Sequence, residues 1–442
     1  MRCIGGEGKN GIFSASSSGK GEMKGMSRTV IPPILLFLAS FLVCAVFTRI
    51  ADPIPLKNDA AGYFRLAENV AVGKGISLDG VSPYSYRAPL FTALLGGWFY
   101  VTGHSTVLSA RIFQCVCIAL SVVFSYFLAL TVFGSRRTAV IMASILAIHP
   151  SLITCTAFVL QEPTLLLFTT LTVWLTLRWF RSGGVKAAVV AGTSWGVATL
   201  GKIVTVYLPL LPFFFLIFPL KRCRRISSRE ALWACAAFLV VLAPWTARNY
   251  YYFHRFIPVN DQGLGMLEWN VSHADPLESA EGGLASNLIH VFRHRPGEGI
   301  KPAGEKFVEE LDAQGVRGGA RRNRMAGYVI DHWKYFLVQR AWNAMYFAVP
   351  STDWWIHSGK LRTVRDNVPT LLLMLLQLPF YLFFAARVWG LLRGMDPGYA
   401  ISYLVVVFLC YWGTYALLVG EPRFSLPVYP VLIALAPWEK WT

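Results

Sequence analysis

The chain has 442 residues, of which 55% are hydrophobic and only 15% are charged, whereas roughly 25% of residues are charged in a typical soluble domain. Together with a mean hydropathy of +0.48, this composition excludes an ordinary soluble protein and predicts a polytopic membrane protein. The formal net charge of +17 does not indicate a nucleic-acid partner, because lysine and arginine fall largely between apolar runs, as the positive-inside rule predicts.

The N-terminal segment is expected to contain a tail and one membrane-spanning helix. Residues 1–28 are rich in Gly, Ser and Lys and lack apolar periodicity, so we expect a disordered cytoplasmic tail, within which Met23 and Met26 are alternative starts. The apolar run 30–50 is long enough to cross a bilayer. It has no small-residue cleavage site, so we interpret it as a retained helix rather than a signal peptide.

The remaining apolar runs predict nine more spans, which makes ten in an all-α fold. The run 185–220 would be about 54 Å long as one helix at 1.5 Å per residue, nearly two membrane cores. We therefore expect it to break at Gly201-Lys202. A shorter apolar helix at 90–100 suits an interfacial position. The nine predicted spans are 106–133, 138–159, 163–181, two within 185–220, 230–245, 368–392, 398–419 and 424–438.

The spans divide the chain into an N-terminal transmembrane catalytic module, 29–245, with a first outer loop at 50–105, an extracytoplasmic region, 246–367, and C-terminal transmembrane helices, 368–442. With ten spans, the basic segments all fall on one side, which the positive-inside rule makes cytoplasmic. These segments contain Lys20, Lys24, Arg28, Arg136, Arg137, Arg181, Lys186, Lys221, Arg222, Arg224, Arg225, Arg387 and Arg393. The opposite, extracytoplasmic side then collects Asp59, Glu162, Lys202 and Arg423.

Each of these four residues also has a purely structural interpretation. Asp59 is a helix N-cap or turn residue in that interpretation, because Asn58-Asp59 precedes a helical pattern. Glu162 is a first-turn acid placed before Pro163, where the helix dipole favours a negative charge. Lys202 and Arg423 are long side chains that reach from the membrane boundary towards water. The eight cysteines show no disulfide framework and no zinc-type spacing.

The motifs occur in a recognisable order. They are Asp59-Ala60-x-x-Tyr63, Ala67-Glu68-Asn69-x-x-x-Gly73-x-Gly75, Tyr86-Arg87-x-Pro89-Leu90, Gly103-x-Ser105, Ala110-Arg111, Gln161-Glu162-Pro163, Gly201-Lys202, Pro244-Trp245-Thr246-Ala247-Arg248-Asn249-Tyr250, Phe256-x-Pro258-Val259 and Arg423-Phe424-x-x-Pro427. This order resembles the membrane glycosyltransferases of the GT-C class, which holds protein O-mannosyltransferases and lipid A aminoarabinose transferases. The resemblance covers nearly the whole chain from about residue 30.

The resemblance implies a polyprenyl-phosphate sugar as donor, an active site on the periplasmic or lumenal face, and a lipid, glycan or protein as acceptor. Asp59 matches the acidic residue of the first outer loop, the candidate general base, and Glu162 matches the second-loop acid, a second candidate catalytic residue. Lys202 matches a lysine that faces the lipid phosphate. The motifs also make Tyr63, Arg87 and Asn249 candidate substrate-binding residues.

Physical chemistry leads to the same assignment. Transfer needs a carboxylate to take the acceptor's proton, and it needs cations where the leaving phosphate gains charge. Lys202, Arg248 and Arg423 are the candidates for those cations. The aminoarabinose transferases carry Glu-Lys-Pro where this chain has Arg87-Ala88-Pro89. An acidic metal contact is therefore missing there, and the sequence leaves the need for a divalent cation open.

Two other functions compete with glycosyl transfer. A transporter or flippase of a lipid-linked or anionic substrate would place its charges near the bilayer midplane and often shows internal repeats. The sequence instead gathers its charges at one face and contains no repeat that we can identify. A non-catalytic scaffold would give the cluster of outer carboxylates and cations no purpose.

Overall fold

The computed structural model describes residues 18–51, 56–217, 226–272, 303–348, 368–393, 395, 398–418 and 422–438. Within them every regular element is a helix. The α-helices are α1 (Ser18–Ile50), α2 (Asn58–Ala71), α3 (Pro89–Thr102), α4 (Val107–Phe133), α5 (Arg136–Ala147), α6 (Pro150–Cys155), α7 (Glu162–Ser182), α8 (Val185–Gly201), α9 (Leu211–Ile217), α10 (Ser228–Phe253), α11 (Gly263–Ser272), α13 (Ala303–Ala313), α14 (Gly318–Asp331), α15 (Trp333–Ala348), α17 (Val368–Leu392), α18 (Tyr399–Leu417) and α19 (Tyr429–Ala434). Three 3-10 helices join them, η1 (Ile203–Thr205), η2 (Leu208–Leu210) and η5 (Pro422–Val428).

Among the described residues, five helices are long and apolar enough to cross a membrane, which confirms an all-helical polytopic membrane fold. They are Ile31–Ile50, Val107–Phe133, Ser228–Phe253, Leu375–Leu392 and Tyr399–Leu417. The other predicted spans correspond to α5 with α6, α7, α8, η1 to α9, and η5 with α19, which are shorter, interrupted or richer in polar residues. A total of ten spans therefore stays a prediction.

Two predicted boundaries can be compared directly with the structure. Helix α8 ends at Gly201 and is followed by η1, so the chain breaks at Gly201-Lys202 as expected. Helix α1 begins at Ser18, inside the segment 1–28 that we expected to be a tail. Residues 1–17 lie outside the described residues, as do parts of the outer region, 273–302 and 349–367.

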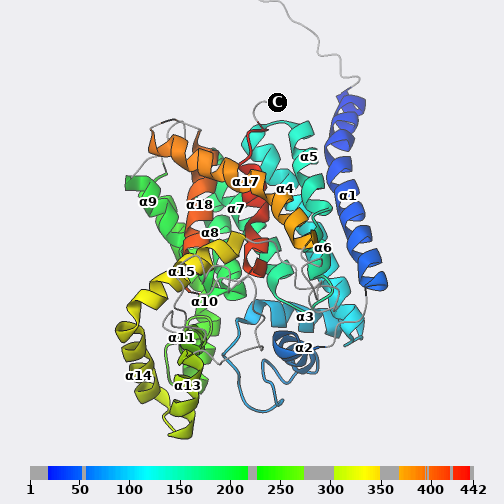
Figure 1. Ribbon diagram of the computed structural model, residues 1–442. Coiled ribbons are helices and arrows are strands. Elements are labelled where there is room, and N and C mark those ends of the chain that lie inside the picture. Colours follow the sequence, from blue (N-terminus) through cyan, green and yellow to red (C-terminus); the bar gives the residue numbers. More distant parts are fainter. Residues whose placement is uncertain are drawn as a thin grey trace, which may run out of the picture.

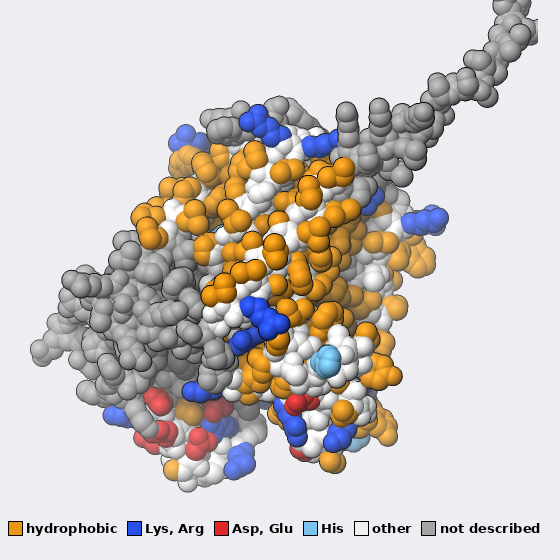
Figure 2. Space-filling view, turned by 90° about the vertical axis from the view of Figure 1, so that its right-hand side faces the viewer, with side chains coloured by type: hydrophobic (Ala, Val, Ile, Leu, Met, Phe, Trp, Pro, Cys, Tyr) orange, Lys and Arg blue, Asp and Glu red, His pale blue; other side chains and the backbone are white. Residues whose placement is uncertain are grey.

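The helices alternate in direction, so that polar outer segments gather at one end (Figure 1). Helices α2, α3, α11, α13 and α14 lie at the lower end of that view, while α5 and α9 lie at the upper end. Hydrophobic side chains cover a broad band of the face shown in Figure 2, and the acidic side chains visible there lie below this band. This distribution is what a bilayer around the middle of the bundle requires.

The bundle is built around α4, α7, α8 and α10. The closest approach joins α8 to α10, because a Cβ at Gly192 would collide with the backbone carbonyl of Ala234. Small residues at such crossings are typical of membrane helices. Trp179 and Trp195 are fully buried beside this crossing, and their ring centroids are 5.9 Å apart.

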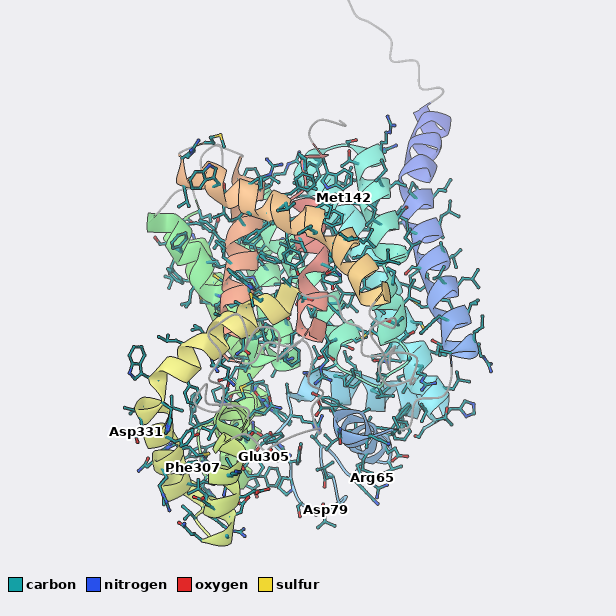
Figure 3. The ribbon with its side chains drawn as sticks, viewed as in Figure 1. Arg65, Asp79, Met142, Glu305, Phe307 and Asp331 are labelled. Carbon is teal, nitrogen blue, oxygen red and sulfur yellow. The ribbon has the colours of Figure 1, made fainter. Side chains whose placement is uncertain are left out.

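The lower end of the molecule in Figure 1 carries two smaller packed units. Helices α2 and α3 pack against each other through buried residues that include Tyr63, Leu95 and Phe99. Helices α11, α13 and α14 enclose a second cluster, fastened by Arg321, whose guanidinium contacts Glu268 at 2.5 Å and Asp312 at 2.6 Å. Figure 3 shows Arg65 and Asp79 at the end of the first unit, Phe307 and Asp331 in the second, and Met142 towards the opposite end of the molecule.

Candidate functional site

Asp59 is held between two arginines that come from distant parts of the chain. Its Oδ1 lies 3.0 Å from Nη2 of Arg87, which lies just before α3. Its Oδ2 accepts a hydrogen bond of 3.1 Å from Nη2 of Arg423 in η5. Arg87 also donates to the backbone oxygen of Asp59 at 3.2 Å. Both carboxylate oxygens are therefore engaged by guanidinium groups, while 48% of the Asp59 side chain stays exposed.

The structure does not support a capping role for Asp59. The N-cap of α2 is Lys57, and Asp59 lies within the first helical turn. Its carboxylate is directed to the two arginines. The electrostatic role of this residue is therefore set by Arg87 and Arg423 rather than by the end of the helix.

The two arginines keep the Asp59 carboxyl group ionised. Burial works to raise its pKa, but the charge of Arg87 and then that of Arg423 outweigh burial and hold the pKa below its ordinary value. Opposite charges within about 4–6 Å have this effect on a carboxyl group. At neutral pH the group is therefore a carboxylate, the form that a general base requires.

The ring of Tyr63 packs against the guanidinium of Arg87. The guanidinium carbon of Arg87 lies 4.2 Å from the centroid of the Tyr63 ring, a cation–π contact. Tyr63 is 4% exposed, packs edge-on against Phe91 at 5.2 Å, and has its pKa raised by burial. A Cβ at Gly62 would lie 2.9 Å from Nη2 of Arg87, so the glycine leaves room for the guanidinium beside α2.

Glu162 and Lys202 form a second, more deeply buried ion pair. Oε1 of Glu162 lies 3.9 Å from Nζ of Lys202, and the two side chains are only 3% and 12% exposed. Oε2 of Glu162 has no hydrogen-bond partner among the described residues. The segment before Glu162 is fixed by Gln114 of α4, which donates to the carbonyl of Phe158 and accepts from the N–H of Leu160 at 3.0 Å.

Phe424 connects the two ion pairs. Nζ of Lys202 lies 3.7 Å from the centroid of its ring, and the guanidinium carbon of Arg423 lies 5.3 Å from the same centroid. Tyr415 stacks on Phe424 at 4.9 Å. The side chains of Lys202 and Arg423 therefore do not extend into solvent, as those of membrane-boundary residues would. We did not assign Phe424 a role from the sequence, although it lies in the Arg423-Phe424-x-x-Pro427 motif.

Arg248 and Asn249 lie elsewhere, and both donate hydrogen bonds to backbone carbonyls. Arg248 donates to the carbonyls of Tyr84 at 3.0 Å and Ile76 at 3.3 Å, and to Oδ1 of Asn249 at 2.9 Å. Asn249 is fully buried and donates to the carbonyl of Ile257 at 3.0 Å. The contacts of Arg248 hold the segment between α2 and α3, in which Arg87 lies. Binding of donor phosphate by Arg248, or of substrate by Asn249, stays a prediction.

The candidate site is rich in cations rather than in metal ligands. In the part of the chain that the structure describes, no three His, Cys, Asp or Glu side chains come together as a metal site would require. Each oxygen of Asp59 already faces an arginine, and Lys202 faces Glu162. The arrangement offers one accessible carboxylate between two arginines, with Lys202 linked to Arg423 through Phe424, which suits proton abstraction next to a site that binds an anion.

A family model of dolichyl-phosphate-mannose-protein mannosyltransferases matches residues 77–258, less than half of the chain. The matched segment contains Arg87, Glu162, Lys202 and Arg248, and it ends before Arg423. Among curated proteins, none matches the sequence significantly.

Two solved structures share the fold. The archaeal oligosaccharyltransferase AglB from Archaeoglobus fulgidus, in complex with an inhibitory peptide and a dolichol-phosphate, is 15% identical, with a TM-score of 0.52 over 91% of this chain and 50% of that one. The Archaeoglobus fulgidus oligosaccharyltransferase complexed with Zn and sulfate is 17% identical, with a TM-score of 0.51 over 92% and 49% of the two chains. The chain thus spans about half the length of these proteins.

A third structure, ArnT from Cupriavidus metallidurans bound to undecaprenyl phosphate, is 16% identical over 90% of this chain and 77% of that one. Its TM-score of 0.41 adds nothing to the fold assignment. The family match and the shared fold confirm the resemblance to the GT-C class.

Proposed function

We propose that this protein, with its GT-C fold, transfers a sugar from a polyprenyl-phosphate donor to an acceptor hydroxyl at the extracytoplasmic face of a membrane. The observation that carries the proposal is the position of Asp59 between Arg87 and Arg423, at the polar end of an apolar bundle. A membrane-embedded donor suits this position, because its polyprenyl chain lies in the bilayer while its phosphate lies at the polar end.

Arg423 and Lys202 are the proposed phosphate-binding residues. Both are mostly buried, with side-chain exposures of 20% and 12%, and both lie against the ring of Phe424. Charge-assisted hydrogen bonds to phosphate are about twice as strong as neutral ones. Preorganised cations of this kind stabilise the charge that develops on a leaving phosphate.

Donor binding would also free the base. With no donor present, both oxygens of Asp59 are engaged by arginines and its pKa is depressed, which makes the carboxylate a weak proton acceptor. A donor phosphate that takes over the Arg423 guanidinium would release Oδ2. The loss of this partner would raise the Asp59 pKa towards its ordinary value, so that the base becomes competent only when the donor is in place.

The proposed reaction is a single displacement. The acceptor oxygen forms a bond to the anomeric carbon while its proton passes to Asp59. The bond between that carbon and the phosphate oxygen breaks, its electron pair stays on the phosphate, and polyprenyl phosphate leaves. One displacement inverts the anomeric centre. Glu162 is too deeply buried to meet a bulky acceptor, and we assign it to holding Lys202.

The test is a turnover assay on the full chain in lipid nanodiscs. Purified protein is incubated with single polyprenyl-phosphate sugars and a membrane extract as the source of acceptors, and the release of polyprenyl phosphate is followed by mass spectrometry. We expect release with one donor class and loss of release in Asp59→Asn. Absence of release with every donor, or equal release by Asp59→Asn, would contradict the proposal.

A further inference from the structure

A second polar cluster lies inside the bundle and shares no residue with the candidate site. Gln377 of α17 donates to the hydroxyl of Tyr429 at 2.7 Å, and its amide nitrogen lies 3.4 Å from Nε2 of His149. The rings of His149 and Tyr429 pack with their centroids 4.7 Å apart. Ser425 of η5 lies 3.4 Å from the same tyrosine hydroxyl. We refer to these four residues as the inner polar cluster.

The inner polar cluster is almost completely buried. His149, Gln377, Tyr429 and Ser425 are 5%, 3%, 2% and 1% exposed. Within the described chain, Nδ1 of His149 and Oε1 of Gln377 have no hydrogen-bond partner. Burying polar atoms without partners is unfavourable, and polar side chains inside a membrane bundle usually have a function. Packing alone therefore does not explain why polar residues occupy these positions.

Gln377 stands where α17 meets the last helices of the chain. Only one face of α17 packs against the core, through Phe380, Tyr381, Phe384, Val388 and Leu391. The opposite face is exposed at Leu375, Leu376, Leu378 and Leu382. Gln377 is a polar residue on the packed face of α17. It donates a hydrogen bond to Tyr429, the residue that follows the end of η5.

The 3-10 helix η5 belongs to both polar regions. Arg423 and Phe424 face the candidate site, whereas Ser425, the next residue, belongs to the inner polar cluster. Such a helix has poorer hydrogen-bond geometry than an α-helix, and Pro427, inside η5, lacks the N–H that would strengthen it. The position of η5 must therefore come largely from its side-chain contacts.

We propose that Gln377 and His149 are positioning residues: through Tyr429 and Ser425 they fix η5, and so they set the Arg423 guanidinium against Asp59. The consequence for turnover rests on the proposed function. The expected effect on the distance between η5 and α2 does not rest on the proposed function, because it follows from the contacts of the inner polar cluster alone.

The first experiment measures this distance without using activity. Asp59→Cys and Arg423→Cys are introduced together into the full chain with its eight cysteines replaced, and the pair is cross-linked with a short bis-maleimide. These substitutions remove the ion pair, so the inner polar cluster is left to hold η5. We expect Gln377→Met or His149→Phe to lower the cross-linking yield about fivefold, within the range of coupling between residues of one network.

Tyr126→Phe is the matched control, because it removes a buried hydroxyl of α4 that has no hydrogen-bond partner among the described residues. An unchanged yield in both cluster variants, or an equal fall in the control, would overturn the proposal. If Gln377→Met fails to insert, His149→Phe and Tyr429→Phe give the same comparison.

The second experiment asks whether Gln377 acts through Arg423. Turnover is measured for Gln377→Met, Arg423→Gln and the double variant. A positioning role predicts that Gln377→Met lowers turnover about tenfold alone and less than about twofold in the Arg423→Gln background, since the two residues then share one effect. Equal factors in both backgrounds would show a purely structural role and overturn the proposal. If Gln377→Met and His149→Phe lower the cross-linking yield but neither the unaltered protein nor any variant shows turnover, the proposed function fails while the positioning role stands.

Discussion

Arg423 in η5 donates a hydrogen bond of 3.1 Å to Oδ2 of Asp59 in α2, although 364 positions separate the two residues in the sequence. The contact joins the last helices of the chain to the first outer loop. It also determines the state of Asp59, because the second guanidinium helps to keep the carboxyl group ionised against the effect of burial. Three of the predictions below concern the charges at this junction.

Asp59→Asn should lower turnover by ~10²–10⁴, the usual contribution of a positioned base, because the amide cannot accept the acceptor's proton. Donor binding should survive. The matched control is Asp79→Asn, which changes a carboxylate that accepts hydrogen bonds from the N–H groups of Val81 and Ser82 in its own loop. Steady-state kinetics on both variants decides the matter, and a similar loss in the control would argue against a base role for Asp59.

Arg423→Gln should move the acid limb of the pH–rate profile to higher pH. The Asp59 pKa is depressed because two cations favour the carboxylate over the neutral acid. Removing one of them lets burial raise the pKa, so protonation begins at a higher pH and activity is lost sooner on acidification. The profile of kcat/KM reports this group in the free enzyme. A limb that stays in place or moves to lower pH contradicts the assignment.

Lys202→Met should lower kcat/KM for the donor by ~10²–10³, the typical effect of losing one group that stabilises charge in a transition state. Methionine keeps much of the length of the side chain, so the contact with Phe424 is preserved in part. Arg248→Met serves for comparison. Because Arg248 holds the carbonyls of Tyr84 and Ile76, we expect that variant to lower the thermal stability of the loop more than donor use. The reverse pattern would make Arg248 the phosphate-binding residue.

Labelling of single cysteines should place the two ends of the bundle on opposite sides of the membrane. Ala313→Cys at the end of α13 and Ser182→Cys at the end of α7 are both exposed positions. In intact cells, a membrane-impermeant maleimide should label the first and not the second, because the basic segments next to Ser182 are expected to be cytoplasmic. Labelling of Ser182→Cys alone would reverse the orientation and move the candidate site to the cytoplasmic face.

Much of the fold followed from hydrophobic runs and their interruptions. The break at Gly201-Lys202 and the short helix α3 were predicted, because run length and glycine placement are local signals. The early start of α1 at Ser18 was not predicted, since the Gly-, Ser- and Lys-rich segment shows no apolar periodicity. Helix α8 is short, and α5 and α6 are separate helices. Hydrophobic run length therefore does not tell here whether a helix crosses the membrane or is buried within the bundle.

The sequence singled out the residues of the candidate site, but it could not predict which acidic residue pairs with which basic residue. Asp59, Arg87, Glu162, Lys202 and Arg423 were all singled out, yet nothing in the sequence pairs Asp59 with Arg423 rather than with Lys202. Such pairings depend on tertiary packing across most of the chain.

One further residue was missed, and the roles of two others stay predictions. Gln114 went unnoticed, although a lone amide in the apolar run 106–133 was a usable signal. Arg248 and Asn249 were predicted to bind donor and substrate, which stays a prediction. In the structure Arg248 donates to the carbonyl of Tyr84, between α2 and α3, and Asn249 donates to the carbonyl of Ile257.

The most direct test of the central claim compares the lipids and envelope glycans of cells that carry the active gene with those of cells that carry the Asp59→Asn variant. Membrane extracts are analysed by mass spectrometry for polyprenyl-phosphate-linked sugars, and surface glycans and glycoproteins are analysed in parallel. We expect one polyprenyl-phosphate sugar to accumulate in the variant while a residue of the same mass disappears from a glycan, lipid or protein acceptor. Unchanged polyprenyl-linked sugars together with unchanged glycans would contradict the account.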